Sequence, residues 1–251
     1  MAMRANSSSP DAAVRERTAL TLLDQWPWES GGVLIGGYAV SAYGHPRYSD
    51  DVDVVIPARS VSGIQTWLRT EGFTMAHRAW RNPQNYDGQV FRFVKETVTL
   101  DVLSGAVRDR EAQVDVPERW ISDRPKRLIL EMLSARSTRK IPIARPEALW
   151  ALKLQSGRDQ DLSDLFALMD QPTDVREVRE LFERLAADSL SRKFQNVLSK
   201  LGERRLFEDS LSRLRLGSPK RHDNIQRWKR FTSRVQSIIG PLAGTTPVGS
   251  R

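Results

Sequence analysis

The sequence contains no cysteine and only three histidines. The lack of cysteine excludes disulfides, thiolate zinc sites and cysteine nucleophiles. His45, His77 and His222 stand in unrelated contexts and show no metal-ligand spacing. A metal site in this chain would therefore be built from carboxylates, and oxygen ligands favour a hard ion such as Mg²⁺.

Long hydrophobic runs and internal repeats are also missing. No apolar stretch approaches the roughly 18 residues of a membrane-spanning helix. The first ten residues are small and polar and lack the hydrophobic segment of a signal peptide. We therefore expect a cytoplasmic protein with no membrane partner. A hydrophobic content of 39% in 251 residues is enough to build a globular core.

Negative charge is scarce in one part of the chain. The whole sequence has 39 Lys and Arg against 31 Asp and Glu, a net charge of +8. Residues 192–234 alone hold thirteen basic and four acidic residues, a net charge of +9, so the remainder is nearly neutral. Such an excess favours a polyanionic partner, and nucleic acid is the common one.

The hydrophobic periodicity changes near residue 145. Before it, strand-like segments alternate with helices; after it, nearly everything predicts helix up to about residue 239. We expect an α+β fold, with an N-terminal mixed sheet flanked by helices and a C-terminal helical region. The expected parts are a disordered N-terminus (1–10), an α/β core (11–145), a helical region (146–240) and a disordered tail (241–251). The expected strands are 32–36, 51–56, 73–80, 89–94, 97–103, 128–133 and 140–143, with turns at Asp87-Gly88 and Lys95-Glu96.

Paired carboxylates mark the second expected strand. Asp51 and Asp53 are two residues apart, so on a strand they point to the same face. Adjacent anions repel unless a cation lies between them. A third carboxylate, Asp101, lies in an apolar run that predicts another central strand, where an unpaired charge is costly. Three carboxylates on neighbouring strands are able to hold two Mg²⁺ ions about 3.5–4 Å apart.

A glycine doublet, Gly36-Gly37, precedes these carboxylates by thirteen residues and opens an expected short helix. Backbone N–H groups at a helix N-terminus bind phosphate, and glycine permits close approach. The alternative is an ordinary turn. Arg47, in the loop before the carboxylates, is either a further phosphate ligand or a solvated loop arginine.

With these residues the chain resembles the polymerase-β-like nucleotidyltransferase superfamily, whose signature is a Gly-Gly or Gly-Ser doublet, a spacer, Asp-hydrophobic-Asp and a later third Asp. It is more similar still to the AbiEii-type toxins, which carry a helix with Lys, then Arg, then Asp-x-x-Asp-Leu. Here that pattern is Lys153, Arg158, Asp161, Asp164 and Leu165. The resemblance covers about residues 31–169, and it identifies the α/β core as a nucleotidyltransferase core.

The resemblance implies a Mg²⁺-dependent enzyme that moves a nucleoside monophosphate from an NTP to an acceptor hydroxyl and releases pyrophosphate. Asp51, Asp53 and Asp101 would be the catalytic and metal-binding residues, with two ions. Gly36, Gly37, Arg47 and Lys153 would bind the triphosphate, and Arg158, Asp161 and Asp164 would line or brace the site. The alternative is that Lys153 is a solvated charge on an amphipathic helix, and that Arg158 pairs with Asp161 and Asp164 on the surface of a helix. The resemblance to toxins of this type implies that the acceptor is an RNA, specifically tRNA, and that a cognate antitoxin protein exists.

Two other functions remain open. One is a small-molecule transferase for an aminoglycoside or lincosamide, although cationic aminoglycosides suit the basic segment poorly. The other is a non-catalytic binding protein, which three intact aspartates disfavour. The cluster of Arg227, Trp228, Lys229, Arg230 and Phe231 mixes cations with aromatics as nucleic-acid surfaces do, so Arg227, Lys229 and Arg230 are candidate RNA contacts. The same segment also fits a helix with an apolar stripe and a charged back.

Overall fold

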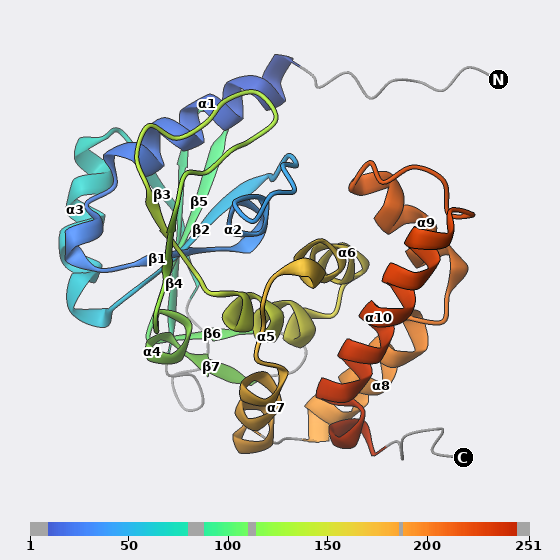
Figure 1. Cartoon of the computed structure of the whole chain (residues 1–251). Coiled ribbons are helices and arrows are strands. Elements are labelled where there is room, and N and C mark those ends of the chain that lie inside the picture. The colour runs from blue at the N-terminus through green and yellow to red at the C-terminus, as the bar shows by residue number, and fades with distance from the viewer. Residues whose placement is uncertain (1–9, 80–87, 110–113, 186–187, 245–251) are drawn as a thin grey trace. The chain divides into compact units, whose positions relative to one another are not determined.

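The fold is that of a computed structural model, which describes residues 10–79, 88–109, 114–185 and 188–244 (Figure 1). The chain divides into two compact units. Unit 1 comprises Met1–Trp80, Gln89–Ser104 and Pro125–Ile143, and unit 2 comprises Arg81–Gly88, Gly105–Arg124 and Ala144–Arg251. Within the described ranges, no helix is long and apolar enough to cross a membrane.

Unit 1 is built on a seven-stranded mixed sheet, in the order β3-β4-β5-β2-β1-β9-β8. Strand β2 lies at its centre, antiparallel to β1 and parallel to β5. The mixed sheet flanked by helices agrees with the fold class expected from the sequence. The strands are β1 (Val33–Ile35), β2 (Asp51–Ile56), β3 (Thr74–Ala79), β4 (Gln89–Lys95), β5 (Val98–Ser104), β8 (Lys126–Leu128) and β9 (Ile141–Ile143).

Helices α1 (Pro10–Gln25), α2 (Gly36–Ser41) and α3 (Val61–Thr70) complete unit 1, with short 3-10 turns η1 (Trp28–Ser30) and η2 (Ala58–Ser60). Trp26, at the end of α1, packs edge-on against Trp67 of α3, their ring centroids 5.5 Å apart. Carboxylates on α1 bind the chain before β9: Asp24 accepts hydrogen bonds from the backbone N–H and the hydroxyl of Thr138. These contacts fix α1 against the rest of unit 1.

Alternation along β2 separates its core from its polar edge. Val52 and Val54 are at most 1% exposed and lie beside Leu100 and Val102 of β5 in the parallel register. Their partners in the alternation, Asp51 and Asp53, are half-buried on the opposite face. Burial of one face thus fixes the register that brings the acidic residues together.

Unit 2 is mainly helical. A small sheet of β6 (Ala106–Arg108) and β7 (Asp115–Pro117) leads into α4 (Glu118–Ile121). The remaining helices pack around apolar stripes, including Phe166, Trp228 and Phe231. They are α5 (Pro146–Ser156), α6 (Asp159–Ala167), α7 (Val175–Arg184), α8 (Asp188–Lys200), α9 (Arg204–Arg213) and α10 (His222–Ile239), with 3-10 turns η3 (Leu168–Asp170) and η4 (Pro241–Ala243).

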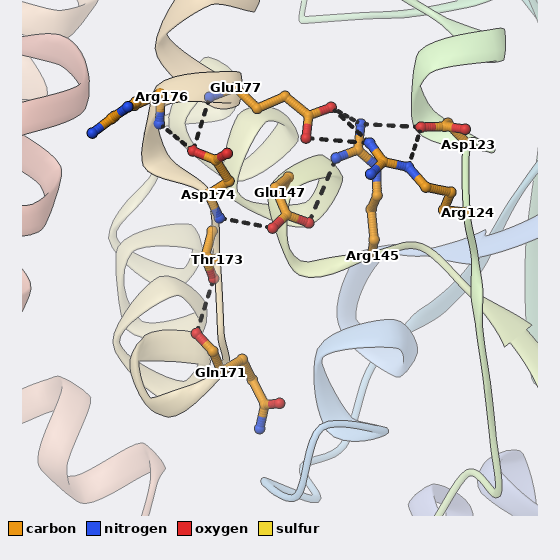
Figure 2. Close-up of polar contacts among 9 residues, drawn as sticks. All are labelled: Asp123, Arg124, Arg145, Glu147, Gln171, Thr173, Asp174, Arg176 and Glu177. Carbon is orange, nitrogen blue, oxygen red and sulfur yellow. Dashed lines mark hydrogen bonds and ion pairs between the residues drawn. The ribbon is translucent and has the colours of Figure 1, made fainter.

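A buried arginine joins three segments of unit 2 (Figure 2). The Arg145 guanidinium pairs with Glu177 of α7 at 2.5 Å and with Glu147 of α5 at 3.6 Å. It also lies over the Trp120 ring, 4.6 Å from the centroid. The carboxylate of Asp174 accepts hydrogen bonds from the first backbone N–H groups of α7, which caps that helix. Paired charges therefore fix the starts of α5 and α7 relative to each other.

Two expectations for local structure were wrong. The predicted strand 128–133 is β8 at Lys126–Leu128, followed by a loop in which Leu130 and Met132 are buried and bound through backbone hydrogen bonds. Pro241–Ala243, expected in the disordered tail, form η4, and the Ala243 carbonyl accepts a hydrogen bond from Gln195. The strands β6 and β7 and the helix α4 were not predicted. Residues 1–9, 245–251 and Asp87 of the first predicted turn lie outside the described residues.

Candidate active site

Three carboxylates meet at the centre of the unit 1 sheet. Asp53 on β2 is the direct neighbour of Asp101 on β5, and Asp51 lies two residues before Asp53 on the same face. One ligand oxygen from each of the three lies within 4.8 Å of the others. The structure thus brings the three predicted catalytic aspartates together. Asp50, by contrast, points to solvent, with its side chain 98% exposed, and pairs with Arg15 at 2.7 Å.

An arginine that the sequence did not single out holds one of these carboxylates. Arg92 on β4 is the cross-strand partner of Asp101. Its Nε donates to Oδ1 at 2.8 Å and its Nη2 to Oδ2 at 2.6 Å, a side-on bidentate pair. These hydrogen bonds raise the pKa of Arg92, so the guanidinium stays charged. Arg92 is the main functional candidate that sequence reasoning missed.

The electrostatics of the cluster oppose full ionisation without a cation. Burial raises the pKa of Asp51, and the negative charge of Asp101 raises it further, while Arg92 lowers it. Like charges this close disfavour the doubly ionised pair. An added cation would relieve the repulsion.

The donor set fits a hard divalent ion. Mg²⁺ takes carboxylate oxygens at about 2.0–2.1 Å, so ligands on opposite sides of one ion stand about 4 Å apart. One oxygen from each of Asp51, Asp53 and Asp101 lies within 4.8 Å of the other two, so the three are close enough to share one ion. Within the described ranges this is the one group of three or more potential metal ligands that gathers so closely.

The glycine doublet lies beside the carboxylates. Gly36 follows Ile35, the register partner of Asp53, and has a φ of +71° as it opens α2. A Cβ at Gly36 would overlap the Asp53 carboxylate, so a side chain there would displace a predicted metal ligand. A Cβ at Gly37 would meet Nη2 of Arg47 at 2.8 Å. Arg47 therefore reaches the first turn of α2, as its prediction as a phosphate ligand requires.

The second predicted group gathers within unit 2. The Lys153 ammonium of α5 pairs with Asp161 and Asp164 of α6, each at 2.8 Å, and its side chain is 10% exposed. Arg158 pairs with the other oxygen of Asp161 at 2.7 Å. Burial would lower the pKa of Lys153, but the charges of Asp164 and Asp161 outweigh it and raise that pKa. The pKa of Asp161 falls to about 2 because Lys153 and Arg158 outweigh its own burial.

The predicted RNA contacts divide into two kinds. Arg227 pairs with Asp170 at 2.9 Å and lies over the Phe166 ring, and Trp228 beside it packs on Phe166. Lys229 and Arg230 are exposed on α10. Seven basic residues of the 192–234 segment are exposed and carry no ion pair to any described residue: Arg192, Arg213, Arg215, Lys220, Arg221, Lys229 and Arg230.

Comparisons with known proteins identify the family of this chain. Residues 20–239 match the family described as "Nucleotidyl transferase AbiEii toxin, Type IV TA system". No curated protein matches the sequence. Solved structures that match include a candidate nucleotidyltransferase from Helicobacter pylori, which is 18% identical over 94% of this chain and 98% of its own, with a TM-score of 0.43.

Two further structures are JHP933 from H. pylori and ANT(2″)-Ia in complex with adenylyl-2″-tobramycin. The first is 16% identical over 95% of this chain and 96% of its own, with a TM-score of 0.43. The second is 17% identical over 73% of this chain and 98% of its own, with a TM-score of 0.35. All three TM-scores are below 0.5. The family match spans the aspartate cluster and the Lys153 group, and the chain belongs to the AbiEii family of nucleotidyl transferase toxins and is a nucleotidyltransferase.

Proposed function

We propose that this nucleotidyltransferase uses Mg²⁺ to transfer a nucleoside monophosphate from an NTP to a hydroxyl of an RNA, with tRNA as the expected acceptor. Membership in a type IV toxin–antitoxin family implies an NTP substrate and a cognate antitoxin. The observation that carries the proposal is the convergence of Asp51, Asp53 and Asp101, with ligand oxygens within 4.8 Å of one another beside a glycine doublet.

The residues have separate tasks in this reaction. Asp51, Asp53 and Asp101 would hold the metal, which neutralises phosphate charge and lowers the pKa of the attacking hydroxyl. The hydroxyl would give up its proton to the Asp101 carboxylate and form a bond to the α-phosphorus, while the bond to the bridging oxygen breaks and pyrophosphate leaves in line. Gly36, Gly37 and Arg47 would receive the triphosphate through backbone N–H groups and the guanidinium.

Lys153 is proposed as a further phosphate ligand, with Asp161, Asp164 and Arg158 as its support. An ammonium has three N–H donors, and Lys153 uses two of them on Asp161 and Asp164. The pairs hold the side chain in one position and so reduce the entropy lost when a phosphate binds. A held lysine is thus a better ligand than a solvated one.

The direct test is incubation of the protein with each labelled NTP, total RNA and Mg²⁺. We expect label in RNA, and no label when the divalent ions are chelated. A panel of aminoglycosides and lincosamides is assayed in parallel. Label in an antibiotic and not in RNA would support the small-molecule transferase instead, and no label in any acceptor would favour a non-catalytic protein.

RNA binding by the basic segment has its own test, a salt series on Lys229→Gln/Arg230→Gln. If both residues contact phosphates, the slope of log affinity against log salt should flatten by up to about two units while NTP affinity stays unchanged. We leave Arg227 out of this variant because Asp170 and Phe166 already occupy it.

A matched control is Lys126→Gln/Lys140→Gln, which removes the same charge from exposed positions outside the segment. If the control flattens the slope equally, overall charge and not these contacts governs RNA binding. An unchanged slope in the test variant would remove Lys229 and Arg230 from the RNA surface.

A further inference from the structure

We infer, on the basis of the proposed metal site, that Arg92 is a positioning residue: it orients the Asp101 carboxylate and offsets one of the three negative charges, which sets how strongly the site binds a divalent ion before the NTP arrives. Arg92 lies on β4, the strand that pairs with β5, and is not one of the three candidate metal ligands.

The first support is the geometry of the ion pair. Arg92 engages both oxygens of Asp101, through Nε at 2.8 Å and Nη2 at 2.6 Å. A side-on guanidinium uses one lone pair of each oxygen and fixes the plane of the carboxylate. Each oxygen keeps a second lone pair for another partner. Asp101 is therefore held in one orientation without losing its capacity to bind a metal ion.

The second support is the charge balance. Asp51, Asp53 and Asp101 carry three negative charges when ionised, and Arg92 reduces the local net charge to minus two, which one divalent ion neutralises. Arg92 pairs directly with Asp101, the register neighbour of Asp53, so its charge acts on the cluster beyond the carboxylate it holds. Without Arg92 the cluster would attract cations more strongly but would hold Asp101 less firmly.

The third support is accessibility. The Arg92 side chain is 45% exposed, whereas that of Asp101 is 12% exposed. An arginine needed only for the apolar core would be covered by its neighbours. The buried partner in this pair is Asp101, the candidate metal ligand, so the main effect of the pair is on the orientation and charge of the Asp101 carboxylate.

The test measures Mn²⁺ binding by electron paramagnetic resonance without NTP, and nucleotide transfer at saturating Mn²⁺. For Arg92→Gln we expect Mn²⁺ to bind about tenfold more tightly, because a positive charge has been removed from the site. Transfer should nevertheless fall by about tenfold or more, because Asp101 is no longer oriented. A merely structural role would not strengthen metal binding.

Arg92→Lys separates the two contributions. Lysine keeps the charge but cannot hold both oxygens side-on, so Mn²⁺ affinity should stay near wild type while transfer still falls. Unchanged or weaker Mn²⁺ binding in Arg92→Gln, or full transfer in Arg92→Lys, would overturn the inference. If the wild-type protein showed no saturable Mn²⁺ binding, the metal site of the proposed function would be wrong. If the wild-type protein bound Mn²⁺ and both Arg92 variants bound it with the same affinity, only the role of Arg92 would be wrong.

Discussion

Asp53→Asn is expected to reduce nucleotide transfer by at least about a hundredfold, the usual loss when a preorganised electrostatic contributor is removed. Asp53 lies between the other two carboxylates, next to Asp101 in register and on the same face as Asp51. Asparagine keeps the size of the side chain but removes its negative charge. Steady-state transfer of a labelled NTP to RNA measures the loss, and the same result is expected for Asp51→Asn.

Asp50→Asn is the matched control, because it removes the same charge one residue before β2. Its side chain is 98% exposed and belongs to an ion pair with Arg15, so transfer should stay within a few fold of wild type. A variant of Asp53 that kept more than about a tenth of wild-type turnover would contradict the role of Asp53 as a metal ligand. Equal losses in both variants would point to net charge and not to metal binding.

Asp51→Asn should lose activity without losing stability. The pKa of folded Asp51 lies above its ordinary value, because of burial and then the charge of Asp101. A raised carboxyl pKa means that the folded state binds the proton more tightly, so this group lowers stability as pH rises through that range. Without metal at neutral pH, the free energy of unfolding of Asp51→Asn should equal or exceed that of wild type, as chemical denaturation will measure.

The centre of the site was predictable because its signals are local. Strand β2 has the predicted bounds, Asp51–Ile56, since alternation of buried valines and acidic residues ends at Pro57. The position of Asp101 in an apolar run predicted β5 within one residue. What no local pattern contained was the parallel pairing of β2 with β5, which places Asp53 beside Asp101. The family resemblance predicted that Asp101 would lie close to Asp53.

Arg92 was missed for a reason of register. The sequence predicted a turn at Lys95-Glu96, which would pair Arg92 with Thr99. The hairpin instead closes between Lys95 and Val98, with Glu96 at a φ of +51°, and the shift of one residue in the turn brings Arg92 opposite Asp101. Between Phe91 and Phe93, an arginine otherwise indicates only the outward face of a strand.

Short edge elements were the least predictable part of the fold. Strand β8 begins with Lys126 and Arg127, both exposed, and charged residues at a sheet edge leave no apolar alternation to detect. Strands β6 and β7 have three residues each. They pair with each other, and an ion pair between Arg108 and Asp115 at 2.5 Å joins them. Three-residue strands are shorter than the windows in which periodicity is measurable.

Lys153→Met is expected to lower the free energy of unfolding by about 3–5 kcal/mol, because removal of one partner of a buried ion pair leaves uncompensated charge. Asp161 and Asp164 are both buried, and each relies on the Lys153 ammonium at 2.8 Å. Urea denaturation at neutral pH measures the loss. A change below about 1 kcal/mol would mean that water reaches the two carboxylates, as it does for surface pairs.

The pH dependence of the free energy of unfolding shows whether the pair of Lys153 and Asp161 stabilises the protein. In wild type the pKa of Asp161 is depressed from 3.8 to about 2, so its stabilising pair is fully present above about pH 4 and is lost as pH falls toward 2. Without Lys153 the buried carboxylate of Asp161 should take up a proton more readily, so the variant should gain stability as the solution is acidified from neutral pH. A parallel pH profile in both proteins would contradict the buried pair.

The variant Lys153→Met/Asp161→Asn/Asp164→Asn separates folding from phosphate binding. With no uncompensated charge left in the cluster, part of the lost stability should return, since a buried amide without a partner costs less than a buried unpaired charge. Arg158 loses a partner but reaches solvent, its side chain being 75% exposed. If Lys153 binds the triphosphate, KM for the NTP should stay at least about tenfold above wild type in this triple variant, because the charge-assisted hydrogen bond from Lys153 to the phosphate is absent. Recovery of both stability and wild-type KM would restrict Lys153 to a structural task, and recovery of stability alone would assign it to the nucleotide.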